Sequence, residues 1–307
     1  MSERESFSAR VPEEAGGRRV DRFIADDLGL FPRSQIAHRD VVVRVDGSVC
    51  KLSHRLRAGQ LVEVDYSRPA DAAIEAEPVP LDIIFENGDV VVVNKPAGMV
   101  VHPAAGNRHG TLAQGLMHRV KTLAGDFDDP ARPGIVHRLD KDTSGVIIAA
   151  KHPQALAELA AQFKQHTVEK RYLAIVRGTL PRSQGTVDAP IGRDPHNRKR
   201  FAIVDPGGKE AVTSYRVLRH FSGYSFVSLT PRTGRTHQLR VHMASLGCPV
   251  VGDPIYARNR SGLPAAGLAL HAYRLRITLP GEDEPRWFTA RLPDRFRNAL
   301  RTVANPA

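Results

Sequence analysis

Four charged side chains lie close together in segment 134–145, whose sequence is GIVHRLDKDTSG. The cations of Arg138 and Lys141 alternate with the carboxylates of Asp140 and Asp142, and apolar residues precede and follow them. A solvated loop seldom lies between two buried runs, so the pattern predicts a carboxylate held beside cations in partly dry surroundings. Opposite charges nearby keep such an aspartate ionised. An ionised, positioned aspartate can act as a nucleophile or a general base, although a structural ion pair at a strand start would give the same pattern.

Positive charge is distributed unevenly along the chain. The 307 residues carry a net charge of +11, and the pI is near 10.0. Residues 1–80 hold 12 Lys and Arg against 14 Asp and Glu, a net charge of −2, so residues 81–307 carry +13. A basic soluble chain favours a polyanionic partner, usually nucleic acid. We therefore expect the polyanion to bind mainly to the second, larger part of the chain.

Several features argue against other classes of protein. No stretch approaches the roughly 18 uninterrupted apolar residues of a transmembrane helix, and the charged N-terminus lacks the apolar region of a signal peptide. We expect a cytoplasmic protein with no membrane partner. Cys50 and Cys248 are far apart and lack a CxxC partner, so we expect buried apolar side chains rather than a disulfide or a zinc site.

Residues 18–66 have the pattern of a small separate module. The predicted elements are an amphipathic helix from residue 19, a second short helix at 32–36, and strands at 41–45 and 61–65, with a hairpin turn at 46–47. Residues 67–80 are rich in Pro, Ala and acidic side chains, which is typical of a linker.

The remaining residues, 81–307, are predicted to form a second domain that positions the charged segment. Strands are predicted at 83–86, 90–95, 146–150, 170–178, 212–218 and 225–230, and helices at 153–164 and 236–246. Many short strands with a few helices indicate the α+β class, with a mixed, mainly antiparallel sheet.

The motifs of this domain resemble those of one enzyme family. The segment HRLDKDTSG at 137–145 is similar to the signature of the RluA-type RNA pseudouridine synthases. Segments 93–103, 233–242, 252–256 and 270–272 resemble further motifs of that family, in the same order. The closest similarity is to the branch acting on large-subunit ribosomal RNA, the ribosomal large subunit pseudouridine synthase D-like branch. Module 18–66 resembles the S-four-type RNA-binding module that often precedes this catalytic domain.

The resemblance implies an isomerisation of uridine within RNA. The bond between the ribose and the uracil nitrogen breaks, the base rotates, and it rejoins the ribose through carbon-5. No redox change and no net hydrolysis occur, so no cofactor is expected, and the sequence contains neither a phosphate-binding P-loop motif nor GxGxxG. The target base must leave the RNA stack, which requires a pocket with a stacking surface and a positioned catalytic group.

The resemblance also assigns catalytic roles to three residues. Asp140 would be the nucleophile, or the base that abstracts the ribose 2′ proton. Tyr172 would stack on the uracil and transfer a proton at carbon-5, and Arg240 would reach Asp140 and hold it ionised. Without the family context, Tyr172 would be an ordinary strand tyrosine and Arg240 a solvent-facing helix arginine.

Further residues are candidates for binding the RNA. Arg138 would fill the gap left by the flipped uridine, because a guanidinium stacks on bases and binds phosphate. Its alternative role is a partner for Asp142. The other candidates are His137, Leu270 as a pocket wall, and Arg198, Lys199 and Arg200 in the basic loop 193–200 as phosphate contacts. A core position for Leu270 and a solvated turn for the loop are the alternatives.

Two near-matches to other sites fail on their spacing or context. His237 and His242 are five residues apart, and no nearby acidic or cysteine ligand completes a set, so no metal ion is expected. The His-Arg-Leu-Asp stretch lacks the other elements of a protein kinase.

The sequence therefore predicts a monomeric RNA pseudouridine synthase acting on large-subunit (23S) ribosomal RNA, free or in a pre-ribosomal particle. A transfer RNA substrate is the alternative within the same class. A non-catalytic RNA-binding or ribosome-assembly factor is the alternative outside it. The sequence leaves open which uridines are modified and which chemical route the reaction takes through Asp140.

Overall fold

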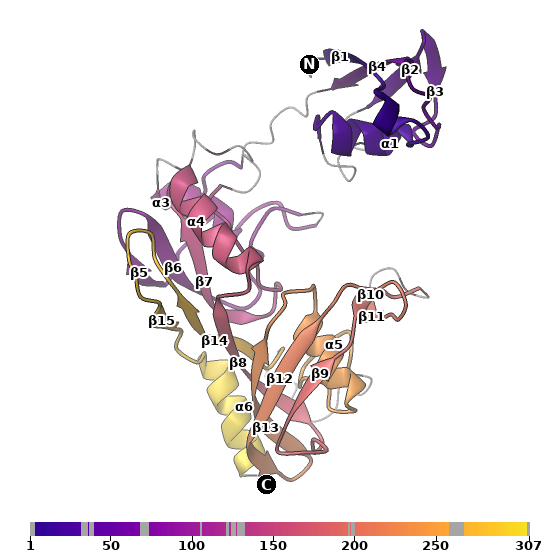
Figure 1. Ribbon diagram of the computed structural model, residues 1–307. Helices are drawn as coiled ribbons and strands as arrows, with labels where there is room; N and C mark the ends of the chain where they lie inside the picture. Colours follow the sequence, from indigo (N-terminus) through magenta and orange to yellow (C-terminus); the bar gives the residue numbers. More distant parts are fainter. Residues whose placement is uncertain are drawn as a thin grey trace. The chain divides into compact units, whose positions relative to one another are not determined.

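The computed structural model describes residues 4–31, 36, 40–67, 74–104, 106–120, 123, 127, 133–195, 197, 200–257 and 267–305. The chain divides into two compact units, Met1–Ala73 and Ile74–Ala307 (Figure 1). Within the described residues, no helix has the length and apolar character needed to cross a membrane.

The first unit contains a four-stranded antiparallel sheet with the order β1-β4-β2-β3. The strands are β1 (Arg4–Arg10), β2 (Val42–Val45), β3 (Ser48–Cys50) and β4 (Leu61–Ser67). Helix α1 (Val20–Arg22) continues into a π-helical turn (Phe23–Asp27), and its apolar face is buried against the sheet. Asp46 and Gly47 both have positive φ, as the tight turn between β2 and β3 requires. The second helix expected at 32–36 falls almost wholly outside the described residues.

The second unit is built on a nine-stranded sheet with the order β5-β6-β7-β14-β8-β13-β12-β9, in which β15 also pairs with β14. Its strands are β5 (Ile83–Glu86), β6 (Val90–Lys95), β7 (Ser144–Ala150), β8 (Glu169–Arg177), β9 (Gln184–Asp188), β12 (Val212–Phe221), β13 (Tyr224–Pro231), β14 (Leu270–Ile277) and β15 (Arg286–Thr289). The β7–β14 pairing is parallel and the other pairings are antiparallel. This sheet confirms the predicted α+β class. A separate hairpin of β10 (Ile191–Arg193) and β11 (Phe201–Ile203) carries the basic loop.

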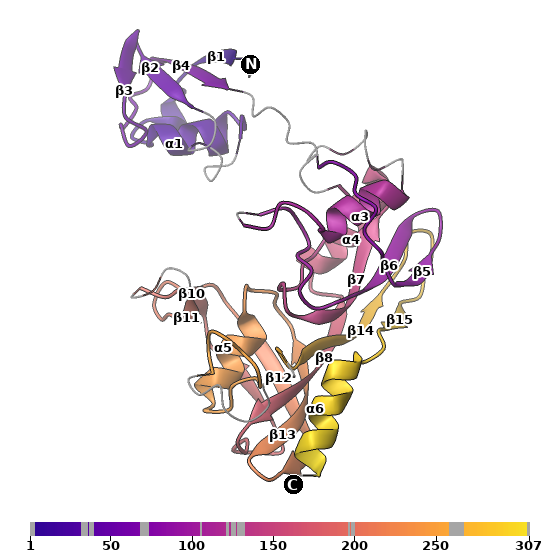
Figure 2. The same ribbon diagram turned by 180° about the vertical axis from the view of Figure 1, so that it is seen from behind.

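Helices cover the two halves of this sheet (Figures 1 and 2). Helices α3 (Leu112–Arg119) and α4 (Pro153–Lys164) contribute to the core around β6 and β7. Helices α5 (Gln238–Ser245) and α6 (Asp294–Ala304) contribute to the core around β8 and β13.

The predicted bounds hold where the local pattern is strong. Strand β6 and helix α4 match the prediction residue for residue. Helix α5 begins two residues later than predicted, because His237 has a left-handed backbone (φ 59°) and cannot belong to the helix. Gly247, also with positive φ, follows the helix as expected.

Candidate active site

The segment before Asp140 lies along the edge of β7. Strand β14 pairs with β7 only at Ser144 and Gly145. Beyond that point, the N–H of Ala150 donates to the carbonyl of Gly134 (2.8 Å), and the N–H of Ile148 donates to His137 Nε2 (3.0 Å). A Cβ on Gly134 would lie 2.1 Å from the carbonyl oxygen of Ala150, so this close approach requires glycine.

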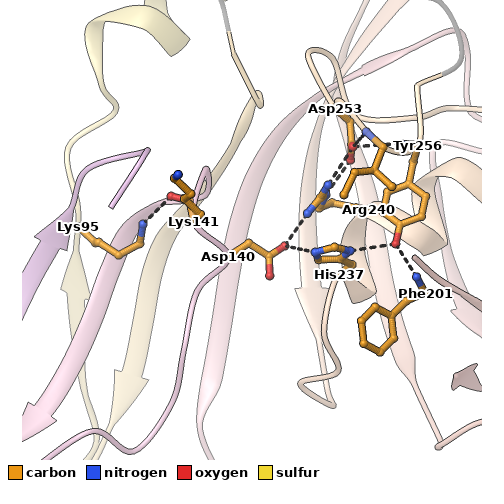
Figure 3. Close-up of polar contacts among 9 residues, drawn as sticks. Lys95, Asp140, Lys141, Phe201, His237, Arg240, Asp253 and Tyr256 are labelled. Atoms are coloured by element: carbon orange, nitrogen blue, oxygen red, sulfur yellow. Dashed lines mark hydrogen bonds and ion pairs between the residues drawn. The ribbon is translucent and has the colours of Figure 1, made fainter. Parts of the chain in front are cut away.

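Lys95 fixes the chain on the other side of Asp140. Its ammonium group donates to the carbonyls of Pro96 (2.9 Å), Met99 (2.8 Å) and Lys141 (3.1 Å), and Figure 3 shows the contact with Lys141. The Lys95 side chain is fully buried. Burial lowers its pKa to about 8, although the nearby charges of Asp142 and Asp140 oppose the shift.

Arg240 lies between two carboxylates (Figure 3). Its Nε and Nη2 donate to Asp253 at 2.7 and 2.9 Å, and its Nη1 donates to Asp140 Oδ2 at 3.0 Å. Burial alone would lower the pKa of Arg240, but the hydrogen bonds and charges of the two aspartates outweigh it and raise the pKa. Asp253 is fully buried and also accepts the backbone N–H groups of Ile255 and Tyr256. The guanidinium is therefore fixed in one orientation toward Asp140.

A second chain of contacts reaches Asp140 through His237. The His237 Nε2 atom lies 4.0 Å from Asp140 Oδ2, and Nδ1 lies 2.9 Å from the hydroxyl of Tyr256. That hydroxyl accepts the backbone N–H of Phe201 at 3.1 Å, which links the start of β11 to the site (Figure 3). Burial lowers the pKa of His237, and the charge of Asp140 acts in the opposite direction.

Asp140, His237 and Arg240 line a cavity of about 480 Å³. Six of the predicted site residues line it, namely His137, Arg138, Asp140, Tyr172, Arg240 and Leu270. Tyr172 on β8 lies directly opposite Ala272 of β14, so both side chains are on the same face of the sheet. We call this the cavity face. Burial raises the pKa of Tyr172, as does the charge of Asp140, so its side chain is a neutral phenol at neutral pH.

The predicted residues differ in how they meet the cavity. Arg138 is exposed, whereas Leu270 is buried in the wall. His137 also has a structural contact, because its ring stacks on Phe163 with centroids 4.6 Å apart and its Nε2 accepts the Ile148 N–H. Burial lowers the pKa of His137 to about 3, so the ring is neutral at neutral pH.

The predicted basic residues of loop 193–200 lie only partly within the described structure. Arg198 and Lys199 are outside the described residues. Arg200 lies apart from the cavity wall, with its Cζ atom 5.3 Å from the centroid of the Tyr256 ring. It therefore meets the same Tyr256 whose hydroxyl bonds to His237.

Four residues at the site received no role from the sequence: Lys95, His237, Asp253 and Tyr256. All four lie within motif segments 93–103, 233–242 and 252–256, but the motifs did not show which of their atoms would meet. The sequence points to His237 only through the His237 and His242 spacing, which does not favour a metal site. Within the described chain, the structure has no group of three or more His, Cys, Asp or Glu side chains arranged to hold a metal ion.

The chain is similar to known RNA pseudouridine synthases. Residues 89–245 match the family model of RNA pseudouridylate synthases. The chain is 42% identical to an uncharacterised RNA pseudouridine synthase, YlyB, of Bacillus subtilis, with 95% of this chain and 96% of that protein covered. It is 39% identical to a ribosomal large subunit pseudouridine synthase D of Borreliella burgdorferi, with 91% and 87% covered.

Among solved structures, the human RNA pseudouridylate synthase domain containing 4 is similar. The TM-score is 0.58 and the sequence identity 29%, with 73% of this chain and 93% of that chain covered. The motifs, the fold and the sequence matches all indicate the same assignment. The chain belongs to the RluA-type family of RNA pseudouridine synthases, which are isomerases acting on RNA.

Proposed function

We propose that this enzyme isomerises specific uridines of large-subunit ribosomal RNA, with Asp140 as the catalytic residue. The main observation is the pairing of the Asp140 carboxylate with the buried, fixed guanidinium of Arg240 at the edge of a cavity of about 480 Å³. The choice of RNA is supported by relatives named ribosomal large subunit pseudouridine synthase D, at 38–40% identity.

Asp140 would attack or deprotonate the flipped nucleotide. Both Arg240 and His237 approach Oδ2 of Asp140, so Oδ1 would meet the substrate. In the reaction, the bond from ribose carbon-1′ to uracil nitrogen-1 breaks and a bond from carbon-1′ to carbon-5 forms. Carbon-5 loses its proton and nitrogen-1 gains one, so the reaction has no net proton change and needs no cofactor.

Tyr172 and Leu270 would form the stacking surface for the uracil. Both line the cavity, and the neutral phenol of Tyr172 can lie against a neutral base without a charge being desolvated. Because Tyr172 is a neutral phenol, it would relay the carbon-5 proton once the new bond has formed: its oxygen would take that proton as its own hydroxyl proton leaves toward nitrogen-1. Arg138 is exposed at the cavity, a position from which its guanidinium could enter the stack vacated by the uridine.

The first unit would add affinity for RNA rather than chemistry. Its predicted module, 18–66, includes a helix and three strands, and β1 adds a fourth strand ahead of residue 18. We propose that it is the S-four-type RNA-binding module, joined through linker 67–80 to the catalytic domain, 81–307. The enzyme would act as a monomer in the cytoplasm, where ribosomal RNA is assembled into particles.

The test is release of tritium from RNA labelled at carbon-5 of its uridines. Large-subunit ribosomal RNA, transfer RNA and pre-ribosomal particles are tested separately with the wild-type enzyme and with Asp140→Ala. We expect wild-type release from ribosomal RNA or its particle and none from the variant. Release from transfer RNA alone would mean that transfer RNA, rather than large-subunit ribosomal RNA, is the substrate. Intact RNA binding without release from any of the three would favour the assembly-factor alternative.

A further inference from the structure

The face of the catalytic sheet opposite Tyr172 presents four arginines from three strands. They are Arg171 on β8, Arg216 on β12, and Arg274 and Arg276 on β14. Side chains alternate along a strand, so Arg171 points away from the face of its neighbour Tyr172. The register places Arg274 opposite Arg171, and Arg276 opposite Glu169.

The register also places Arg216 on this face. Arg216 on β12 lies opposite Ser228 on β13, and Ser228 lies opposite Leu173 on β8. Leu173 is two residues from Arg171 on the same strand, so all of these side chains are on one face of the sheet. We call the surface formed by Arg171, Arg216, Arg274 and Arg276 the arginine face.

Helix α6 covers a different part of the same side of the sheet. Its Phe296 packs on Phe226 of β13, with ring centroids 6.3 Å apart. The part nearer Arg171 is hollowed instead, by a cavity of about 580 Å³. Its polar lining includes Arg171, Arg216 and the side chains of Thr186, Ser214, Ser228 and Thr230. Hydroxyl and guanidinium groups are donors suited to phosphate oxygens.

The positive charge of the arginine face is only partly neutralised by the protein. Glu169, the acidic residue lining the cavity, forms an ion pair with Arg171 at 2.7 Å. Like charges directly opposite each other on neighbouring strands destabilise a sheet, and Arg171 and Arg274 are such a pair. In the described part of the chain, the buried Nε atoms of Arg274 and Arg276 have no hydrogen-bond partner. An anion bound here would reduce the repulsion between the guanidinium groups.

An aromatic ring lies among these cations. The Cζ atom of Arg171 is 4.6 Å from the centroid of the Trp287 ring, and Trp287 lies opposite Arg276 on β15. Arginines and an aromatic side chain on an open sheet surface are a combination that proteins use for nucleic acids.

We propose that the arginine face binds the sugar–phosphate backbone of a second segment of the RNA substrate, remote from the segment that enters the active-site cavity. The occupant follows from charge complementarity, because the enzyme acts on RNA and RNA is a polyanion. The inference requires only that the substrate is RNA, so it does not depend on which uridine or which RNA is modified. A short stem-loop held at the cavity would not reach the arginine face, because the sheet separates the two.

The test compares binding of a short uridine-containing stem-loop with binding of a long folded large-subunit ribosomal RNA transcript across a salt series. We expect Arg216→Glu to weaken binding of the long RNA roughly three- to tenfold and to reduce the slope of log Kd against log salt by about one. Binding of the stem-loop should not change. Arg274→Gln should shift long-RNA binding in the same direction. Arg301→Glu, a charge reversal at an exposed position of α6, is the matched control.

Circular dichroism and thermal midpoints establish whether each variant is folded. If Arg216→Glu does not fold, Arg216→Gln is used in its place. Equal Kd and equal slope for the long RNA in Arg216→Glu and Arg301→Glu would overturn the proposal. Equal loss for both RNAs would also overturn it, because the arginines would then act through the cavity or through total charge. Inorganic phosphate at millimolar concentration and unlabelled long RNA are also compared as competitors of labelled long RNA. If phosphate displaces the labelled RNA as fully as unlabelled RNA does, the occupant is a small anion rather than RNA.

Discussion

Arg240 and Arg216 belong to the same unit, but their surroundings differ. Arg240 is buried and forms hydrogen bonds with two aspartates, one of which is itself fully buried. Arg216 is exposed on the arginine face, where four guanidinium groups are accompanied by the carboxylate of Glu169. A fixed guanidinium gives geometric precision at the cavity face, whereas exposed cations give attraction at long range and over many RNA conformations. Substitutions on the cavity face should therefore change catalysis or folding, and those on the arginine face mainly affinity.

The largest expected effect is that of Asp140→Asn. Turnover should fall by at least about a thousandfold, because a neutral amide can neither attack nor accept a proton, while RNA binding stays within a few fold. Asp142→Asn is the matched control, since it makes the same change two residues along the chain. Equal loss in both variants would mean that the charge of the segment, rather than Asp140, determines activity. Tritium release and RNA binding are measured on the same preparations.

Asp253→Asn should have the next largest effect, through stability. It would leave Arg240 with one carboxylate in a buried position, and breaking a buried pair costs about 3–5 kcal/mol. Asp294→Asn breaks the ion pair with Arg297 at an exposed site and should change stability little. Urea unfolding followed by the fluorescence of Trp287, the single tryptophan, reports on the catalytic unit. Similar losses in the two variants would contradict the contrast between buried and exposed pairs.

Acid should destabilise the catalytic unit through two histidines, the buried His271 and the half-buried His137. Burial lowers the pKa of His271 to about 4 and that of His137 to about 3, from an ordinary value near 6.5. Below pH 6.5 the unfolded chain binds protons that the folded protein does not, so the free energy of unfolding falls as the pH drops. The loss continues to about pH 4 for His271 and about pH 3 for His137. Between pH 7 and pH 5 it should be about 2 kcal/mol for each histidine.

The variant His271→Gln tests this assignment. It should reduce the loss of stability between pH 7 and pH 5 by about 2 kcal/mol, measured as urea unfolding at the two pH values. An unchanged pH dependence would mean that His271 is charged in the folded protein or that other groups control acid unfolding.

The smallest expected effect is at His237, whose ring and backbone can be tested separately. His237→Gly removes the ring but favours the observed positive φ, whereas His237→Ala removes the ring and strains the backbone. If the ring positions Asp140, both variants should lower kcat about tenfold with little change in KM, and the pH profile of kcat should change. Wild-type kcat in His237→Gly, with a loss in His237→Ala, would assign the role to the backbone alone.

Local sequence patterns were sufficient for much of the fold. Val90–Val93 is a fully apolar run bounded by turn residues, and such a run predicts a buried strand wherever it lies. Helix α4 begins at Pro153 after the N-cap His152, a local signal that predicts the observed start. The signature around Asp140 and the order of the motifs were likewise sufficient for the family and the reaction.

The contacts that complete the site depend on residues far apart in the sequence. Arg240 and Asp140 are 100 residues apart, and Lys95 and the Lys141 carbonyl are 46 apart. The family resemblance alone predicted the first pair, and nothing in the sequence predicted the second. No local periodicity encodes either contact, because both exist only when β6, β7 and α5 are packed in one unit. The left-handed conformation of His237 is another tertiary outcome, since its ring contacts Tyr256 from that position.

The arginine face likewise separates what the sequence alone determines from what the tertiary structure decides. The sequence by itself determined that residues 81–307 are basic, because charge is a sum over residues and needs no fold. Which arginines gather on one side was decided by strand register, including the irregularity between Ala272 and Arg274 that places Arg274 opposite Arg171. A one-residue shift in register would move these side chains to the other face of the sheet. Composition and motifs therefore determined the class of partner and the family, and only the packed sheet decided which charges lie together and on which face.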